Sequence, residues 1–124
     1  MSVTYTTAVK NARLDAVTTA IGTTGVLEIG TAAMASVLAT INLGNPAAAG
    51  AASGILTLSG FPRSDSSADN TGTAAAARIR TAGGGTDIIT GLTVGLSGSD
   101  INLDSLSITA GQTVTINSAA ITHA

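Results

Sequence analysis

The acidic and amide side chains of residues 63–72 are the first group in this chain that could do chemistry. Asp65, Asp69 and Asn70 lie within this polar segment, RSDSSADNTG, and supply oxygen atoms of the kind that Ca²⁺ binds. The spacing does not fit a calcium-binding loop of the EF-hand type, because glycine is misplaced and Ala76 stands where the closing acid belongs. We therefore interpret the segment as a solvated loop and predict no metal site.

Asp100 and Asp104 are a second carboxylate pair, which could serve glycoside hydrolysis. On a strand they would share a face at about 13 Å, from a rise of about 3.3 Å per residue. This separation is too wide for paired carboxylate catalysis. We interpret both residues as turn formers.

The glycine-rich segment TAGGGTD (81–87) could form a phosphate-binding loop. Such loops join a strand to a helix, and the commonest type carries a lysine. Here lysine is missing, and the residues that follow alternate as a strand does. The segment therefore predicts a hairpin turn, in which glycine adopts positive φ.

The remaining inventory argues against an enzyme. The chain has no cysteine and one histidine, His123, so neither a Ser-His-Asp triad nor a histidine cluster can be assembled. Five basic residues and a net charge of −2 predict no binding to nucleic acid or to anionic membranes. No apolar run approaches the ~18 residues of a membrane span. We expect no catalytic residue, no cofactor and no metal.

Three arginines are candidate partner contacts. Arg78 and Arg80 share the polar face of a predicted strand, and Arg63 lies in the nearby polar segment. Because guanidinium groups form bidentate hydrogen bonds with carboxylates, the three arginines could contact acidic groups of a partner. An ordinary solvent-facing surface is the alternative interpretation.

The N-terminal residues have the 3.6-residue periodicity of an amphipathic helix over about 6–21. One stripe contains Leu14, Val17 and Ile21, which are the second set of candidate partner contacts. A neighbouring apolar stripe consists of Val9, Ala12, Ala16 and Ala20. The opposite, polar side holds Asn11, Asp15 and Thr18. Thr4, Thr6 or Thr7 could cap the first turn, and Gly22 could end the helix.

From about residue 25 to 122 the period changes from 3.6 to 2, which predicts short strands. The longest alternation runs through Ile88, Thr90, Leu92, Val94 and Leu96. A slip of phase at residues 104–105 indicates a bulge or a corner. Residues 45–53 and 63–72 are expected to be loops. The chain is therefore predicted to be one domain, 1–124, mainly β, sandwich or jelly-roll-like, with one N-terminal α-helix.

Aromatic residues make up 2% of the chain and charged residues 10%. A core with so few large side chains buries little apolar surface. This burial offsets little of the conformational entropy that each residue loses on folding. We therefore expect partner subunits to add stability, in a homo-oligomer such as a dimer or trimer.

The sequence resembles a group of short proteins encoded among the virion genes of tailed bacteriophages. The resemblance extends over about residues 5–122 and is sharpest in NARLDAVTTAIG and in VGLSGSDINLDSLSITAGQTVTI. It implies a structural role without catalysis, most like that of a capsid decoration, or cement, protein. The implied partner is the major capsid protein, and the implied location is the capsid surface of the virion after synthesis in the bacterial cytoplasm.

Two other functions remain open at this point. A tail, neck or head–tail joining protein of the virion would have the same composition. A carbohydrate- or surface-binding β module usually displays aromatic residues that stack on sugars, and only Tyr5 and Phe61 are available here.

Overall fold

The N-terminal helix is present as α1 (Thr7–Ile21) in the computed structural model, which describes residues 4–44, 47–48, 50–82 and 85–122. Thr6 is the N-cap residue: its side-chain oxygen accepts a hydrogen bond from the Val9 amide at 3.4 Å. This bond satisfies one of the amides that the first turn leaves free. Gly22, at φ 72°, ends the helix in a conformation that glycine adopts without strain. No helix in the described part of the chain is both long and apolar enough to cross a lipid bilayer.

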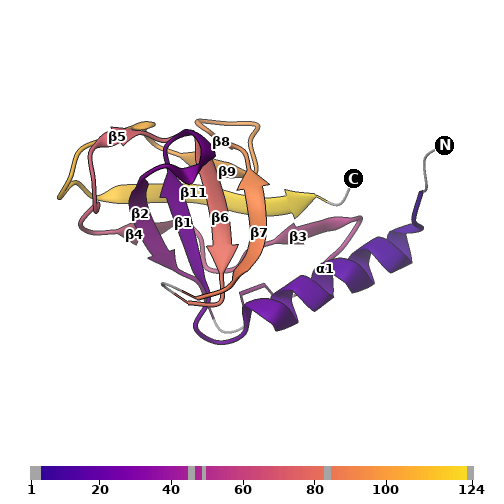
Figure 1. Cartoon of the computed structure of the whole chain (residues 1–124). Helices are drawn as coiled ribbons and strands as arrows, with labels where there is room; N and C mark the ends of the chain where they lie inside the picture. Colours follow the sequence, from indigo (N-terminus) through magenta and orange to yellow (C-terminus); the bar gives the residue numbers. More distant parts are fainter. Residues whose placement is uncertain (1–3, 45–46, 49, 83–84, 123–124) are drawn as a thin grey trace.

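The rest of the described chain is mainly β and forms a sandwich-like fold (Figure 1). The first sheet is antiparallel, in the order β2-β1-β6-β7. Its strands are β1 (Val26–Gly30), β2 (Val37–Asn42), β6 (Ala76–Arg80) and β7 (Asp87–Leu92). A short 3-10 turn, η1 (Ala32–Met34), connects β1 to β2.

The second sheet is built around the long C-terminal strand β11 (Val114–Thr122), in the order β3-β11-β9-β8. Its other strands are β3 (Ile55–Thr57), β4 (Arg63–Asp65), β8 (Val94–Gly95) and β9 (Ile101–Leu103). Strand β4 pairs with the beginning of β11, and β3 pairs with its end. Strands β5 (Gly72–Thr73) and β10 (Ser107–Ile108) form a separate two-stranded ladder.

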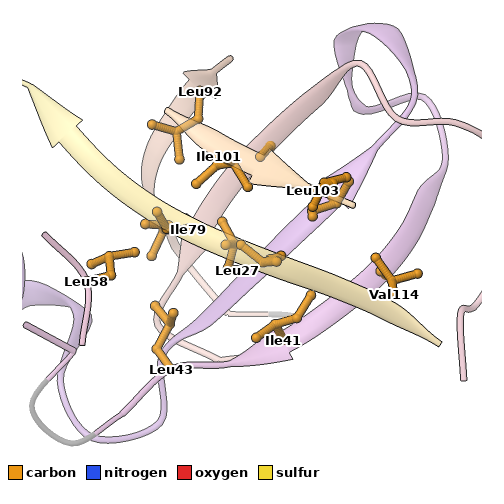
Figure 2. Packing of buried hydrophobic residues seen from close by; sticks show 14 of the residues in the cluster. Leu27, Ile41, Leu43, Leu58, Ile79, Leu92, Ile101, Leu103 and Val114 are labelled. Atoms are coloured by element: carbon orange, nitrogen blue, oxygen red, sulfur yellow. The ribbon is translucent and has the colours of Figure 1, made fainter. Parts of the chain in front are cut away.

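The hydrophobic core lies where β11 crosses the first sheet (Figure 2). Alternating residues of each sheet point into this space, and they are almost entirely aliphatic. Those of the first sheet include Leu27, Ile29, Ile41 and Ile79. Those of the second include Ile101, Leu103, Val114 and Ile116. Because each side chain is fully or nearly fully buried, two small sheets enclose a continuous core without tryptophan or buried aromatic rings.

Strand β7 departs from the alternation that its sequence predicts. Leu92 is buried, but Thr90 is exposed, and Leu96 lies beyond the strand with 59% of its surface exposed. The register explains this difference, because Ile79 pairs with Ile89 while Ala77 pairs with Leu92, which leaves an extra residue in β7. Gly91, at φ 74°, lies in this bulge. The expectation of one uninterrupted face over residues 88–96 was therefore wrong.

The predicted change of phase near residues 104–105 is confirmed as a corner. Strand β9 ends at Leu103 in the second sheet, and β10 begins at Ser107 in the β5–β10 ladder. A bulge in β11 accounts for the second irregularity of the pattern, because Ile116 and Ser118 pair with the adjacent residues Leu103 and Asn102. Because of this extra residue, the buried position of β11 that follows Ile116 is Ala119, three residues later instead of two.

Both predicted loops contain more structure than their composition indicated. Within residues 45–53, Ala47 and Ala48 are buried in the core, and Ala48 forms a bridge with Leu58. Asn45 and Pro46 lie outside the described residues. The segment 63–72 begins with strand β4, and Ala68 is buried. The small side chains of Ala47, Ala48 and Ala68 allow these segments to pack closely against the core.

The segment 81–87 connects β6 to β7, which pair as an antiparallel hairpin, as predicted. Thr81 closes the connection: its amide donates to the Thr86 carbonyl at 3.0 Å, and its hydroxyl oxygen accepts from the Thr86 amide at 3.1 Å. Gly85 donates from its amide to the Ala82 carbonyl. Gly83 and Gly84 lie outside the described residues, as does His123.

Candidate functional site

Arg78 and Arg80 are held by acidic partners within the first sheet. Glu28 lies opposite Arg78 in the β1–β6 register, on the face away from Leu27 and the core. Its Oε1 lies 2.6 Å from Arg78 Nε and 3.8 Å from Arg80 Nη1. Arg80 Nε lies 2.8 Å from Asp87 Oδ1, an ion pair whose angle falls short of hydrogen-bond geometry. The four side chains, which we call the charged cluster, are neutral in sum.

Glu28 is the member of this cluster that our sequence reasoning missed. It is only 6% exposed although it is charged. The signal was its place in the run VLEIG, where one acid stands among apolar residues of a predicted strand. A buried carboxylate needs a charged or hydrogen-bonding partner, so this position pointed to a basic residue on a neighbouring strand.

The charged cluster changes what Arg78 and Arg80 can offer to a partner. Their side chains are 22% and 21% exposed, and each already contacts a carboxylate of this chain. A carboxylate of another protein would have to compete with Glu28 and Asp87. The two arginines therefore have a role inside the sheet that their spacing alone did not reveal.

Arg63 is bound mainly to backbone carbonyls. Its Nε donates to the Ser59 carbonyl at 3.2 Å, and its Nη1 donates to the Asn42 carbonyl at 3.3 Å. The guanidinium carbon also lies 5.8 Å from the centre of the Phe61 ring. These bonds connect β4 and the preceding turn to the end of β2. Arg63 thus joins the two sheets rather than standing free in a loop.

The helix docks through the predicted stripe of Leu14, Val17 and Ile21 and through its polar side, and not through the second apolar stripe. Leu14 and Ile21 are 3% and 1% exposed and belong to the core of this chain, with Val17 partly buried beside them. A partner could reach this stripe only if the helix lifted away. On the predicted polar side, Asn11 Oδ1 accepts from the Gly54 amide at 2.9 Å, and Asp15 Oδ1 accepts from the Ala51 amide at 2.8 Å.

The second predicted apolar stripe consequently faces solvent. All four of its residues are exposed, namely Val9, Ala12, Ala16 and Ala20. Arg13 is also exposed on this side, and its guanidinium carbon lies 4.3 Å from the centre of the Tyr5 ring. We call this surface, together with Tyr5, the outward face of α1. The N-terminal half of α1 extends beyond the strands at this end of the molecule (Figure 1).

The aspartates of the polar segment 63–72 bind backbone along the edge of the first sheet. Asp65 Oδ2 accepts from the Thr40 amide at 3.0 Å, and the Asp69 amide donates to the Leu38 carbonyl at 2.7 Å. Asn70 Nδ2 donates to the Val37 carbonyl at 2.8 Å. These bonds close the outer edge of β2, a position at which an unpaired strand would invite association.

Asp100 holds the loop that follows β7. Its Oδ2 accepts from the Thr93 amide at 3.0 Å, while its own amide donates to the Thr93 hydroxyl at 2.9 Å. Beside it, Asn102 exchanges two hydrogen bonds with the backbone of Ser99. Asp104 makes no side-chain bond of this kind among the described residues, and its amide donates to the Thr115 carbonyl at 3.4 Å.

Neither a pocket nor a group of three metal-ligating side chains is found in the described ranges. The comparisons with protein-family models, with curated proteins and with solved structures give no match to this chain. The two candidate features of this structure are therefore the exposed outward face of α1 and the largely buried charged cluster.

Proposed function

We propose that this protein is a structural component of a tailed-bacteriophage virion, a decoration protein that binds the outer surface of the capsid and stabilises it. One observation carries the proposal: six of the seven acidic side chains hold the fold together. They bind backbone amides, a hydroxyl group or arginines of the same chain, and they are Asp15, Glu28, Asp65, Asp69, Asp87 and Asp100.

This use of charge suits a protein that acts by attachment. Acid–base and metal chemistry need ionisable groups that are free to change partner or protonation state. Here such groups secure strand edges and loops in a small β fold. The resemblance over residues 5–122 supports the same role. A protein that binds only the assembled lattice stabilises it by linkage, and copies that are joined in an oligomer bind the lattice with avidity, so no single contact needs to be strong.

Cryo-electron microscopy of purified virions, with quantification of the protein in them, tests the proposal. We expect density for this chain on the outer capsid, between major capsid subunits, at a copy number that follows the capsid lattice. A small ring of copies at the neck or tail would favour the alternative of a tail, neck or head–tail joining protein. Absence from the particle would contradict both functions.

We also propose that the protein forms a homo-oligomer, a dimer or trimer, or requires the capsid for full stability. The physical reason is the composition of the core, whose fully buried side chains are aliphatic and include no aromatic ring. Sedimentation velocity at micromolar concentration should show an oligomer. A monomer that melts above ~65 °C, the upper end for mesophilic domains, would contradict this expectation.

A further inference from the structure

The charged cluster lies on the one pairing of the first sheet that no short turn controls. Strands β1 and β2 are joined by residues 31–36, and β6 and β7 by residues 81–86, so the length and geometry of each turn fix the register of its hairpin. Strand β1 instead pairs with β6 across residues 31–75 of the chain. The register of this long-range pairing has to come from contacts between the two strands themselves.

Hydrophobic patterning excludes some registers of β1 against β6 but leaves one open. The core-facing residues of the two strands are fully buried, namely Leu27, Ile29, Ala77 and Ile79. A slip of one residue would turn the apolar set of one strand to the other face of the sheet. A slip of two residues keeps both faces, and in one direction it sets β1 against residues 74–77, which are four alanines. Identical small side chains give packing little with which to distinguish this register from the native one.

The charges do distinguish the two registers. In the native register Glu28 lies directly opposite Arg78, with Oε1 2.6 Å from Nε, and Arg80 reaches the same oxygen from the diagonal position at 3.8 Å. In the slipped register Glu28 would lie opposite Ala76, and Arg78 would take the diagonal position. The carboxylate of Glu28, which is 6% exposed, would then lose the closer of its two cations. A buried charge without a close partner is costly, so electrostatics disfavours the slip.

We propose that the charged cluster is a register lock, which specifies how β1 pairs with β6 and adds little net stability. Apolar residues of similar volume can often replace a buried ion pair without loss, because desolvation of the charges offsets their attraction. The slipped register bears the same desolvation without the close partner. The cluster therefore acts on the free-energy difference between the two registers. This role concerns the fold alone and does not depend on what the protein binds.

Removal of Glu28 and both arginines together tests the register lock. The variant Glu28→Met/Arg78→Met/Arg80→Met should unfold in urea at a midpoint equal to that of wild type or above it. In nuclear magnetic resonance spectra it should show a second set of amide signals for β1 and β6, whereas wild type should show one. Ser64→Val/Thr115→Val removes a cross-strand hydroxyl pair from the β4–β11 ladder. This matched control should show a single set.

Contacts between backbone protons identify the register of each set of signals. In wild type, Leu27 should contact Ile79, its partner in the native pairing. In the second set of signals of the methionine variant, Leu27 should contact Ala77 instead, which corresponds to the slip of two residues toward the alanines.

A milder variant keeps the test decisive if the methionine variant does not fold. Glu28→Thr/Arg78→Thr places two β-branched side chains opposite each other and leaves Arg80 with Asp87. It should fold and show the same two registers. A single native register in either variant that folds would overturn the proposal, because packing would then suffice. Loss of cooperative unfolding in both variants would also overturn it, because the cluster would then supply the stability of the sheet.

Discussion

Glu28 shows at the scale of one residue how this chain uses charge. A carboxylate in the middle of a strand, 6% exposed, loses most of its hydration on folding. The Arg78 guanidinium at 2.6 Å replaces that hydration, and Arg80 adds a second cation. The ion pair therefore matters chiefly because each partner would be costly if it were left alone in this position.

Removal of the Glu28 charge should consequently destabilise the fold. We expect Glu28→Gln to lower the free energy of unfolding by about 3 kcal/mol, the range found when one partner of a buried pair is removed. Asp87→Asn is the matched control, since the side chain of Asp87 is 44% exposed. It should cost under ~1 kcal/mol. Urea denaturation of both variants checks this, and equal losses would contradict the distinct role of Glu28.

Leu14 provides a second test at a single residue. Leu14→Asp introduces a charge at a position that is 3% exposed between α1 and the strands. We expect a loss of several kcal/mol in stability, because nothing in the core compensates the buried carboxylate. Ala16→Asp, on the outward face of the same helix, should change stability by under ~1 kcal/mol. Thermal unfolding measures both losses of stability. Equal losses for the two variants would contradict this orientation of α1.

At the scale of an element, the polar segment 63–72 closes the edge of the first sheet. Asp65 contacts β2 through the Thr40 amide and also accepts from the Ser67 amide at 3.0 Å. Asp65→Ala leaves the Thr40 amide without its acceptor and should cost about 1–3 kcal/mol. It should also increase association at high protein concentration, because the edge of β2 becomes available for pairing.

Asp65→Asn is the control for this effect, since its amide oxygen can still accept from Thr40. We expect it to lose less stability and to remain as soluble as wild type. Denaturation together with light scattering measures both properties. Identical behaviour of the alanine and asparagine variants would show that the Asp65 side chain does not protect this edge.

The bulge in β7 depends on the backbone conformation of Gly91. Its φ of 74° is one that other residues adopt only at a cost, although the space around it is open. Gly91→Ala should therefore destabilise the protein by about 1 kcal/mol. Gly50→Ala, at a site that is equally open but without positive φ, should be neutral or slightly stabilising. Equal effects in calorimetry would contradict a strained conformation at residue 91.

Elements of this chain were predictable where one physical signal dominates. The helix, its Thr6 cap and its end at Gly22 follow from periodicity and capping chemistry. The 81–87 hairpin was predicted from its glycine-rich composition, although Gly85 does not adopt positive φ and the bonds of Thr81 with Thr86 close the turn. The stripe with Leu14 and Ile21 was predictable, but the surface that docks beside it was not, because Ala12 and Ala16 are apolar yet exposed. Asn11 and Asp15 are polar yet directed at backbone amides. Hydrophobic patterning does not detect such hydrogen bonds.

The candidate site was harder to predict than the fold. The strand alternation placed Arg78 and Arg80 correctly on one face of β6, opposite the core-facing Ile79. Their partners, Glu28 and Asp87, come from strands about 50 and 7 residues away in the sequence. The local β6–β7 hairpin brings Asp87 to Arg80, but only the pairing of β1 with β6 brings Glu28 to the arginines. That pairing is set by long-range packing that local patterns do not contain.

At the scale of the whole molecule, the parts combine into a small β body whose charges stabilise its own edges and loops. The helix at one end presents an apolar surface with one arginine. This division between a β body that uses its charges internally and an exposed helix face suits a protein that attaches to a repeated lattice. The proposed function requires that attachment make the lattice more resistant to heat and internal pressure.

Heat release of packaged DNA from capsids with and without this protein tests that requirement most directly. We predict that particles lacking the protein release their DNA at a lower temperature and that added purified protein restores the higher one. Identical release curves with and without bound protein would contradict a stabilising role on the capsid.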